Sequence, residues 1–255
     1  FLIGGLAPVL MIRERYQELA QRQERIRLVT GVRESLANPS YAILCIVSAL
    51  IVVAWITFDA LGIYVSTYHV FGGDLKRAAY LQGLAALVGV GGTLAGVPLV
   101  IWLAHRIEKR NAALLCLGCA SGSAAARWWL YTPESPYLQL LAPVLAVPSG
   151  AVWVLLNSMK ADVCDEEELR TGQRREGVVG AVSGWIHKLA GALSFGLTGL
   201  VLAGTGFAQE LGAAQPVETL LGLRLAFAFA PVILFLVGFV VLLRYRLDRK
   251  RVEEI

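Results

Sequence analysis

Residues 42–69 read AILCIVSALIVVAWITFDALGIYVSTYH, and Asp59 is the one charged side chain in this stretch. As a helix the stretch would be roughly 40 Å long at 1.5 Å per residue, which exceeds the ~30 Å hydrocarbon layer of a bilayer. A backbone in lipid must satisfy its own hydrogen bonds, and a helix does so within one segment. The stretch is therefore predicted to be a membrane-spanning helix.

Five more long apolar segments follow, and together the six predict an all-α polytopic transmembrane helix bundle. The chain is 56% hydrophobic and 16% charged, whereas soluble domains average about 25% charged residues. None of the segments has the alternating pattern of a transmembrane β-strand. The six predicted spans are 42–69, 79–104, 112–131, 138–159, 178–206 and 220–243.

The segments outside these spans are short or charged. Residues 1–12 are apolar but shorter than the ~20 residues of a full span. No charged region precedes them, so they are predicted to be the end of an earlier span in a fragment that lacks its amino-terminal part, rather than a signal peptide. Residues 13–40 are predicted to be an amphipathic linker, 41–243 the six-helix domain and 244–255 a tail.

The basic residues alternate between the two ends of the predicted bundle. Eighteen of the 23 lysines and arginines lie in 13–40, in HRIEKR (105–110), in 160–177 and in the tail. The opposite connectors hold only Lys76 and Arg77. The positive-inside rule therefore places the first group of connectors and the carboxyl terminus in the cytoplasm. Because topology explains the net charge of +4, the charge gives no reason to expect a nucleic-acid partner.

Three other site classes are also disfavoured. Cys116 and Cys119 have the spacing C-x-x-C, but without a second pair they indicate core side chains rather than a metal or redox site. The glycines at 89, 91 and 92 lie within an apolar span, where small residues favour close helix packing rather than dinucleotide binding. The chain has no set of nucleophile, base and orienting group, so an enzyme is not predicted.

Ionisable side chains at membrane depth are the first candidates for function. Lys188 lies about 16 Å into the fifth full span at 1.5 Å per residue, too deep to snorkel easily. It is expected to face a polar cavity or to pair with a carboxylate, and Asp59 is either that partner, a residue lining the pathway or a helix–helix contact. Arg127 and Arg224 lie one turn inside their spans and are expected to snorkel to the headgroups.

Two further residues of the fourth full span, Trp153 and Asn157, lie one helical turn apart on one face. An indole ring at this depth either packs in the bundle or serves as a platform for the CH face of a sugar ring, with polar groups binding the hydroxyls. His187, which precedes Lys188, is expected to be a packed polar residue.

The stretch from Trp153 to Lys188, WVLLNSMKADVCDEEELRTGQRREGVVGAVSGWIHK, resembles one known family. It is similar to the glycoside–pentoside–hexuronide:cation symporters of the major facilitator superfamily, whose type member is the melibiose permease. The family pattern is a tryptophan, then A-D-x-x-D, then T-G-x-R-x-E-G, then a lysine in the eleventh helix. These motifs are filled here by Trp153, Ala161, Asp162, Asp165, Thr171, Gly172, Arg174, Glu176, Gly177 and Lys188.

The resemblance implies a carboxyl-terminal half, with 1–12 as the end of helix six and the six spans as helices seven to twelve. It implies symport of a sugar with H+ or Na+ across a bacterial inner membrane, no cofactor, and an amino-terminal half that this chain lacks. Trp153, Lys188, Asn157 and Asp59 are the expected sugar-binding residues, and Lys188 is also expected in cation coupling. Asp162, Asp165, Arg174, Arg175 and Glu176 are the expected cytoplasmic gate.

One departure from the family bears on the coupling ion. Four residues before Lys188, some members carry a threonine that helps to hold Na+, and this chain has Gly184, which favours H+. Two alternatives stay open at this point. They are a major facilitator carrier of lipid-like or other amphiphilic solutes, and a membrane protein that transports nothing.

Overall fold

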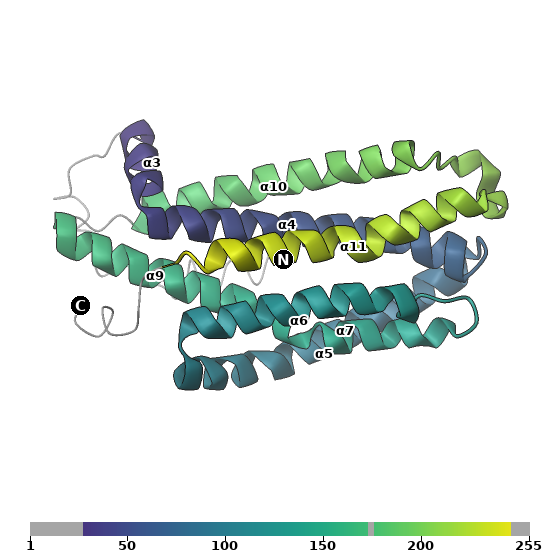
Figure 1. Ribbon diagram of the computed structural model, residues 1–255, viewed down its shortest axis with the longest axis horizontal. Helices are drawn as coiled ribbons and strands as arrows, with labels where there is room; N and C mark the ends of the chain where they lie inside the picture. Colours follow the sequence, from purple (N-terminus) through teal and green to yellow (C-terminus); the bar gives the residue numbers. More distant parts are fainter. Residues whose placement is uncertain (1–27, 173–175, 246–255) are drawn as a thin grey trace, which may run out of the picture.

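The computed structural model describes residues 28–172 and 176–245, and within these ranges the chain is helical and contains no strand. The predicted all-α membrane bundle is thereby confirmed. The long helices run side by side along one axis (Figure 1). They are α4 (Pro39–Tyr64), α5 (Leu75–Ile107), α6 (Lys109–Leu130), α9 (Val152–Thr171), α10 (Glu176–Gly204) and α11 (Val217–Leu242). The shorter helix α3 (Leu28–Ala37) stands across this axis at the start of α4.

Shorter elements complete the chain between these helices. A π-helix, η1 (Val65–Val70), continues α4 without a break, and the 3-10 helix η3 (Gln209–Ala214) connects α10 to α11. Between α6 and α9 lie the 3-10 helix η2 (Pro136–Leu140) and the short helices α7 (Leu141–Leu145) and α8 (Val147–Gly150). In the packing, α11 lies against α4 and α6, α10 lies against α4, and α5 lies against α7 and α8.

The start of α4 is fixed by its sequence. Asn38 has extended backbone angles, and its side chain accepts hydrogen bonds from the amides of Ser40 and Tyr41. Pro39 occupies the first turn of the helix, where its missing amide costs nothing. Asn38 and Pro39 thus separate α3 from α4.

The segment predicted as one span over 138–159 is broken instead. The part Pro136–Leu145 and the part Val147–Arg170 meet at a bend of 47°. Pro143 and Pro148 lie in this region, and a proline inside a helix removes a hydrogen bond and clashes with the preceding turn. A hydropathy profile does not reveal this bend, because both prolines lie among apolar neighbours.

The charged stretch that begins at Lys160 was predicted to be a connector, and it is helical instead. In the structure α9 continues to Thr171 and ends at Gly172, which has a φ of 68°. Lysine, alanine, glutamate, leucine and arginine are all good helix formers, and glycine takes the left-handed conformation at a helix end readily. Asp162 and Asp165 therefore project from a helix.

Within the described ranges, four helices are long and apolar enough to cross a membrane: Pro39–Val70 (α4 with η1), α5, α10 and α11. The bent pair around Leu145 and Val147 makes a fifth if it is counted as one span. By composition α6, which is rich in alanine, glycine and serine, is not in this group. The six predicted spans therefore remain a prediction at α6.

Close packing of α5 against the bent region depends on glycine. A Cβ atom added at Gly96 would lie 2.5 Å from Cγ1 of Val147 and 3.0 Å from its carbonyl oxygen, and one added at Gly92 would lie 2.6 Å from Cγ2 of Val147. No side chain fits at such distances. The expected role of this glycine-rich segment in close helix contact is confirmed at these two positions.

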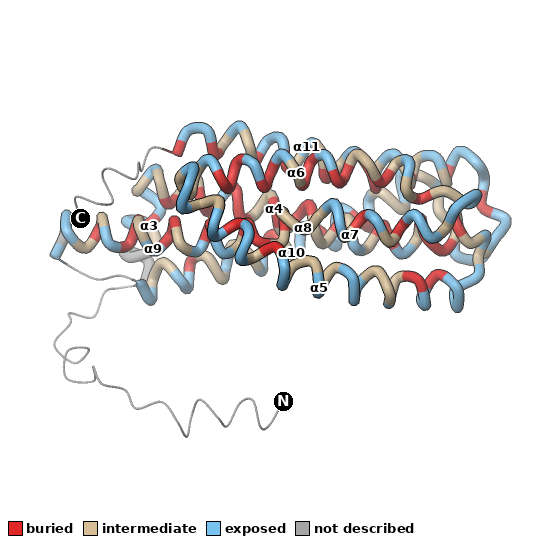
Figure 2. The backbone as a smooth tube through the Cα atoms, turned by 90° about the horizontal axis from the view of Figure 1, so that it is seen from below, coloured by how far each residue is buried: buried red, intermediate tan, exposed pale blue. Residues whose placement is uncertain are grey.

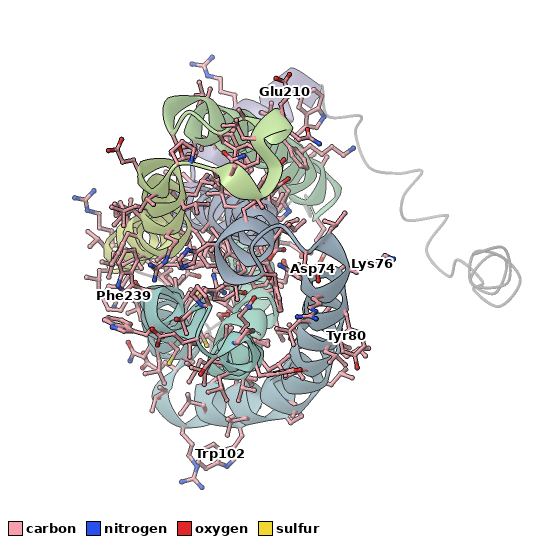
Figure 3. The ribbon with its side chains drawn as sticks, turned by 90° about the vertical axis from the view of Figure 1, so that its right-hand side faces the viewer. Asp74, Lys76, Tyr80, Trp102, Glu210 and Phe239 are labelled. Atoms are coloured by element: carbon pink, nitrogen blue, oxygen red, sulfur yellow. The ribbon has the colours of Figure 1, made fainter. Side chains whose placement is uncertain are left out.

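Burial is uneven across the bundle. Figure 2 shows buried residues concentrated where α4, α6 and α11 meet, and long exposed stretches on α5. Tyr80 and Trp102 of α5 point away from the bundle in the end-on view of Figure 3, and they are 69% and 56% exposed. Outward aromatic and aliphatic side chains are what a surface that meets lipid or another apolar partner requires.

Candidate solute-binding site

Three aromatic rings meet where α4, α9 and α10 converge. The ring centroids of Trp55 and Trp153 are 5.9 Å apart, with the planes tilted by 60°. The imidazole of His187 meets Trp153 edge-on, with 5.2 Å between ring centroids and an angle of 84°. The expectation that His187 is packed is confirmed, and its neighbour is the indole that the sequence singled out. Both tryptophans are partly buried, so each ring retains open surface within this chain.

The bend before α9 places Trp153 within this cluster. Trp153 is the second residue of α9 and follows the break between α8 and α9 directly. Since α9 extends to Thr171, about 18 residues separate the indole from the helix end, or roughly 27 Å at 1.5 Å per residue. The ring therefore lies deeper from the charged end of the bundle than the sequence indicated.

The polar candidates lie on the same three helices as this aromatic cluster and are exposed within this chain. Asp59 follows Trp55 by one helical turn on α4, and Asn157 follows Trp153 by one turn on α9. Residues four apart on a helix share a face. Lys188 is the residue after His187 on α10, and it forms no hydrogen bond or ion pair with the part of the chain that the structure describes.

Arg127 does not snorkel, so that prediction is wrong. Its side chain is 7% exposed, and its guanidinium carbon lies 3.0 Å from the ring centroid of Phe58. It interacts electrostatically with Asp59, the residue after Phe58. The cation within range of Asp59 is therefore Arg127 and not Lys188. The prediction used only the distance of Arg127 from the end of its helix. That distance does not show that α4 and α11 cover this part of α6.

Arg224 is held against Trp128, the residue that follows Arg127, and its expected approach to the headgroups stays a prediction. It donates a hydrogen bond of 2.9 Å to the carbonyl oxygen of Trp128, and its guanidinium carbon lies 4.3 Å from the centroid of the Trp128 indole. This contact joins α11 to α6. A cation over an indole is worth about 0.5–1 kcal/mol at exposed sites.

Lys160 was counted among the exposed basic residues of a loop, and the structure places it inside the bundle. Its side chain is 7% exposed. The sequence did contain a signal, because Trp153 and Lys160 are seven residues apart and therefore lie on one face of α9. This spacing is informative only if the helix continues past Met159, whereas the predicted span ended there.

The residues expected to form the cytoplasmic gate are only partly described. Asp162 pairs with Lys109, whose Nζ is 2.7 Å from both carboxylate oxygens, so that the pair links α9 to α6. Asp165 and Glu176 are exposed. Arg174 and Arg175 lie outside the described residues. Asp162 thus has its partner on α6 of the same helix bundle.

With this arrangement established, comparison with known proteins identifies the family. The profile of the family described as "MFS/sugar transport protein" matches residues 2–249, nearly the whole chain. The chain belongs to this family. MFS/sugar transport proteins are transporters and not enzymes, and the expected resemblance to the symporters of the major facilitator superfamily is confirmed.

Named relatives within the family agree with this. The chain is 24% identical over 203 residues to the "Glucuronide carrier protein homolog" of Escherichia coli (77% of this chain, 44% of the relative). It is 24% identical over 238 residues to the "Isoprimeverose transporter" of Lactiplantibacillus pentosus (93% and 48%). It is 34% identical over 97 residues to the "Putative glycoside/cation symporter YagG" of Escherichia coli (38% and 21%). The chain spans about half the length of these curated relatives at most.

Proposed function

We propose that this chain acts as the carboxyl-terminal half of a cation-coupled symporter that moves a sugar or glycoside by alternating access. The amino-terminal half, which supplies the rest of the site, is part of this proposal. The observation that carries it is the aromatic cluster of Trp55, Trp153 and His187, which lies beside exposed polar residues on three helices of a chain from a sugar-transport family. The similarity to a putative glycoside/cation symporter supports the same proposal.

The chemistry of the cluster suits a sugar. A pyranose has apolar CH faces and a rim of hydroxyls, so it needs an aromatic surface and several polar groups in one place. In the proposed site the indole of Trp153 contacts the CH face. Asp59 and Asn157 accept or donate hydrogen bonds to hydroxyls, and Arg127 places a positive charge within electrostatic range of Asp59. Lys188 supplies a cationic group from the third helix.

The proposed coupling ion is H+. Gly184 offers no side-chain oxygen at the position where some relatives carry threonine, and Na+ needs several oxygen ligands. We also propose that Asp162, Asp165, Arg174, Arg175 and Glu176 form a gate at the cytoplasmic end, in a bacterial plasma membrane. Exchange of ion-pair partners there changes the preference between inward-open and outward-open states by a few kcal/mol.

The test is solute uptake by the full-length protein in proteoliposomes. A panel of labelled pentosides, hexosides and hexuronides is offered with an inward gradient of H+ or of Na+. The proposal expects uptake of at least one sugar above the no-gradient level, driven by H+. Movement of labelled lysophospholipid in place of every sugar would favour an amphiphile carrier. No movement of any solute by correctly folded protein would favour a protein that transports nothing.

Replacement of Lys188 by alanine tests the third helix of the site. Removing one charged group that binds solute costs about 1.5–3 kcal/mol, so sugar uptake is expected to fall roughly tenfold or more. Lys76→Ala is the matched control, because Lys76 is exposed in the first turn of α5, at the opposite end of the bundle from Lys160. Membrane content of each variant is measured by immunoblot. Normal uptake by Lys188→Ala would remove this residue from the mechanism.

A further inference from the structure

Lys160 is a buried cation that the site described above does not use. Its side chain is 7% exposed, and no hydrogen bond or ion pair links it to any residue in 28–172 or 176–245. Burial of an ammonium group without a counter-ion is unfavourable, and proteins avoid this cost by pairing the group or by releasing its proton. Lys160 has no carboxylate with which to pair in this part of the chain.

The acid nearest in sequence is already engaged elsewhere. Asp162, two residues further along α9, is directed toward α6 and holds Lys109 at 2.7 Å. A residue two positions away on a helix does not share a face with Lys160. The ion pair between Asp162 and Lys109 therefore does not involve Lys160.

The titratable groups within electrostatic range of Lys160 come from α4 and α10. From α4, Cys45 lies within electrostatic range of it, and from α10 His187 does so. Tyr41 of α4 donates a hydrogen bond of 2.7 Å to the carbonyl oxygen of Val179 and lies 3.0 Å from the hydroxyl of Ser183. Neither Cys45 nor His187 is a carboxylate, so neither fixes Lys160 in its charged form as an ion-pair partner would. The environment therefore tolerates both forms of Lys160, which a proton-exchange site requires.

Lys160 is also connected to the solute site. It lies on α9, the helix that carries Trp153, about 10 Å further along at 1.5 Å per residue. His187 is in contact with the Trp153 ring and in electrostatic range of Lys160. A solute on the indole that shifts His187, or that excludes water from between α4, α9 and α10, changes the cost of holding the charge. Solute binding and protonation are thereby linked, and the effect is reciprocal.

We propose that Lys160 is a proton-exchange site of the carboxyl-terminal half, taking up H+ as an ammonium on one side of the membrane and releasing it as a neutral amine on the other. This inference rests on the proposed function as a sugar symporter. The step involves no redox chemistry, because one N–H bond forms with a proton from water and later breaks to return it to water.

The experiment separates sugar exchange from proton movement in the reconstituted full-length protein. Counterflow of the best-transported sugar of the panel is measured at equal pH on both sides, and sugar-driven H+ influx is measured with an entrapped pH dye. The variants are Lys160→Met, which is always neutral, and Lys160→Arg, which is always charged. Lys76→Met is the control. Size-exclusion chromatography confirms that each variant is folded.

Both Lys160 variants are expected to keep counterflow within about threefold of wild type and to lose H+ influx by about tenfold or more, which corresponds to ~1.4 kcal/mol or greater. Wild-type H+ influx in Lys160→Arg or in Lys160→Met would overturn the inference, as would loss of counterflow in both. Wild-type counterflow with Na+ influx and no H+ influx would overturn it and leave the symporter proposal intact. A wild-type protein without counterflow would instead contradict the proposed function itself.

Discussion

Trp153→Ala is expected to abolish most sugar binding while leaving the protein folded. Full burial of a large apolar side chain against a partner is worth about 1.5–3 kcal/mol, and each 1.4 kcal/mol is tenfold in Kd. Loss of the indole platform should therefore weaken binding by roughly 10- to 100-fold. Uptake as a function of sugar concentration, in proteoliposomes of the full-length protein, measures the change.

The aromatic series distinguishes stacking from packing. Trp153→Phe keeps a smaller ring and is expected to give an intermediate Kd, and Trp55→Ala is expected to weaken binding less, since Trp55 supports Trp153 at 5.9 Å. Trp185→Ala is the matched control, because this indole is 69% exposed on the same helix as His187. Equal Kd values for wild type and Trp153→Ala would exclude the indole from the site.

Gly96→Leu is expected to destabilise the bundle. Its Cβ atom alone would lie 2.5 Å from the side chain of Val147 and 3.0 Å from the carbonyl oxygen of that residue. Backbone atoms cannot move aside without separating α5 from α8. Overpacking costs roughly 1–3 kcal/mol or more, which corresponds to a fall in Tm of about 5–10 °C for a domain of this size. Thermal unfolding of the detergent-solubilised full-length protein measures the shift.

Two controls make the packing explanation specific. Gly122→Leu on α6 is expected to change the Tm little, since a Cβ atom there meets nothing within 4 Å in the described chain. In Gly92→Ala the added Cβ atom would lie 2.6 Å from one methyl group of Val147. The second substitution Val147→Ala removes that methyl group and should therefore restore most of the stability lost in Gly92→Ala. An unchanged Tm in Gly96→Leu would mean that α5 and α8 are further apart than described here.

The helices were largely predictable because their cause is present in each segment. A run of about 20 or more apolar residues meets the length requirement of a bilayer without help from neighbours, and the observed α10 and α11 begin and end within a few residues of the predicted 178–206 and 220–243. The bend of 47° before α9 was not predictable from hydropathy. It depends on two prolines whose effect on direction is set by how α5 packs against them.

The candidate site was predictable only in part. Trp153 was found by its spacing from Lys188, but Trp55 was not, since a tryptophan within an apolar run usually indicates packing. A turn-by-turn comparison of Trp55 with Asp59 on α4 would have revealed it. Arg127 and Lys160 were misplaced for a common reason. Depth along one helix says nothing about which other helices cover a side chain, and that cover decides whether a charge reaches water.

The most direct test of the central claim is whether solute occupies the face formed by α4, α9 and α10. A single cysteine is introduced by Asn157→Cys in a full-length protein whose native cysteines have been replaced by serine, and its reaction with a maleimide is timed with and without the transported sugar. Saturating sugar is expected to slow labelling at this position about fivefold or more, and to leave a Leu200→Cys control unaffected, because bound sugar excludes the reagent from the occupied site. Unchanged labelling at position 157, in a protein that still transports, would contradict the assignment of this face as the sugar site.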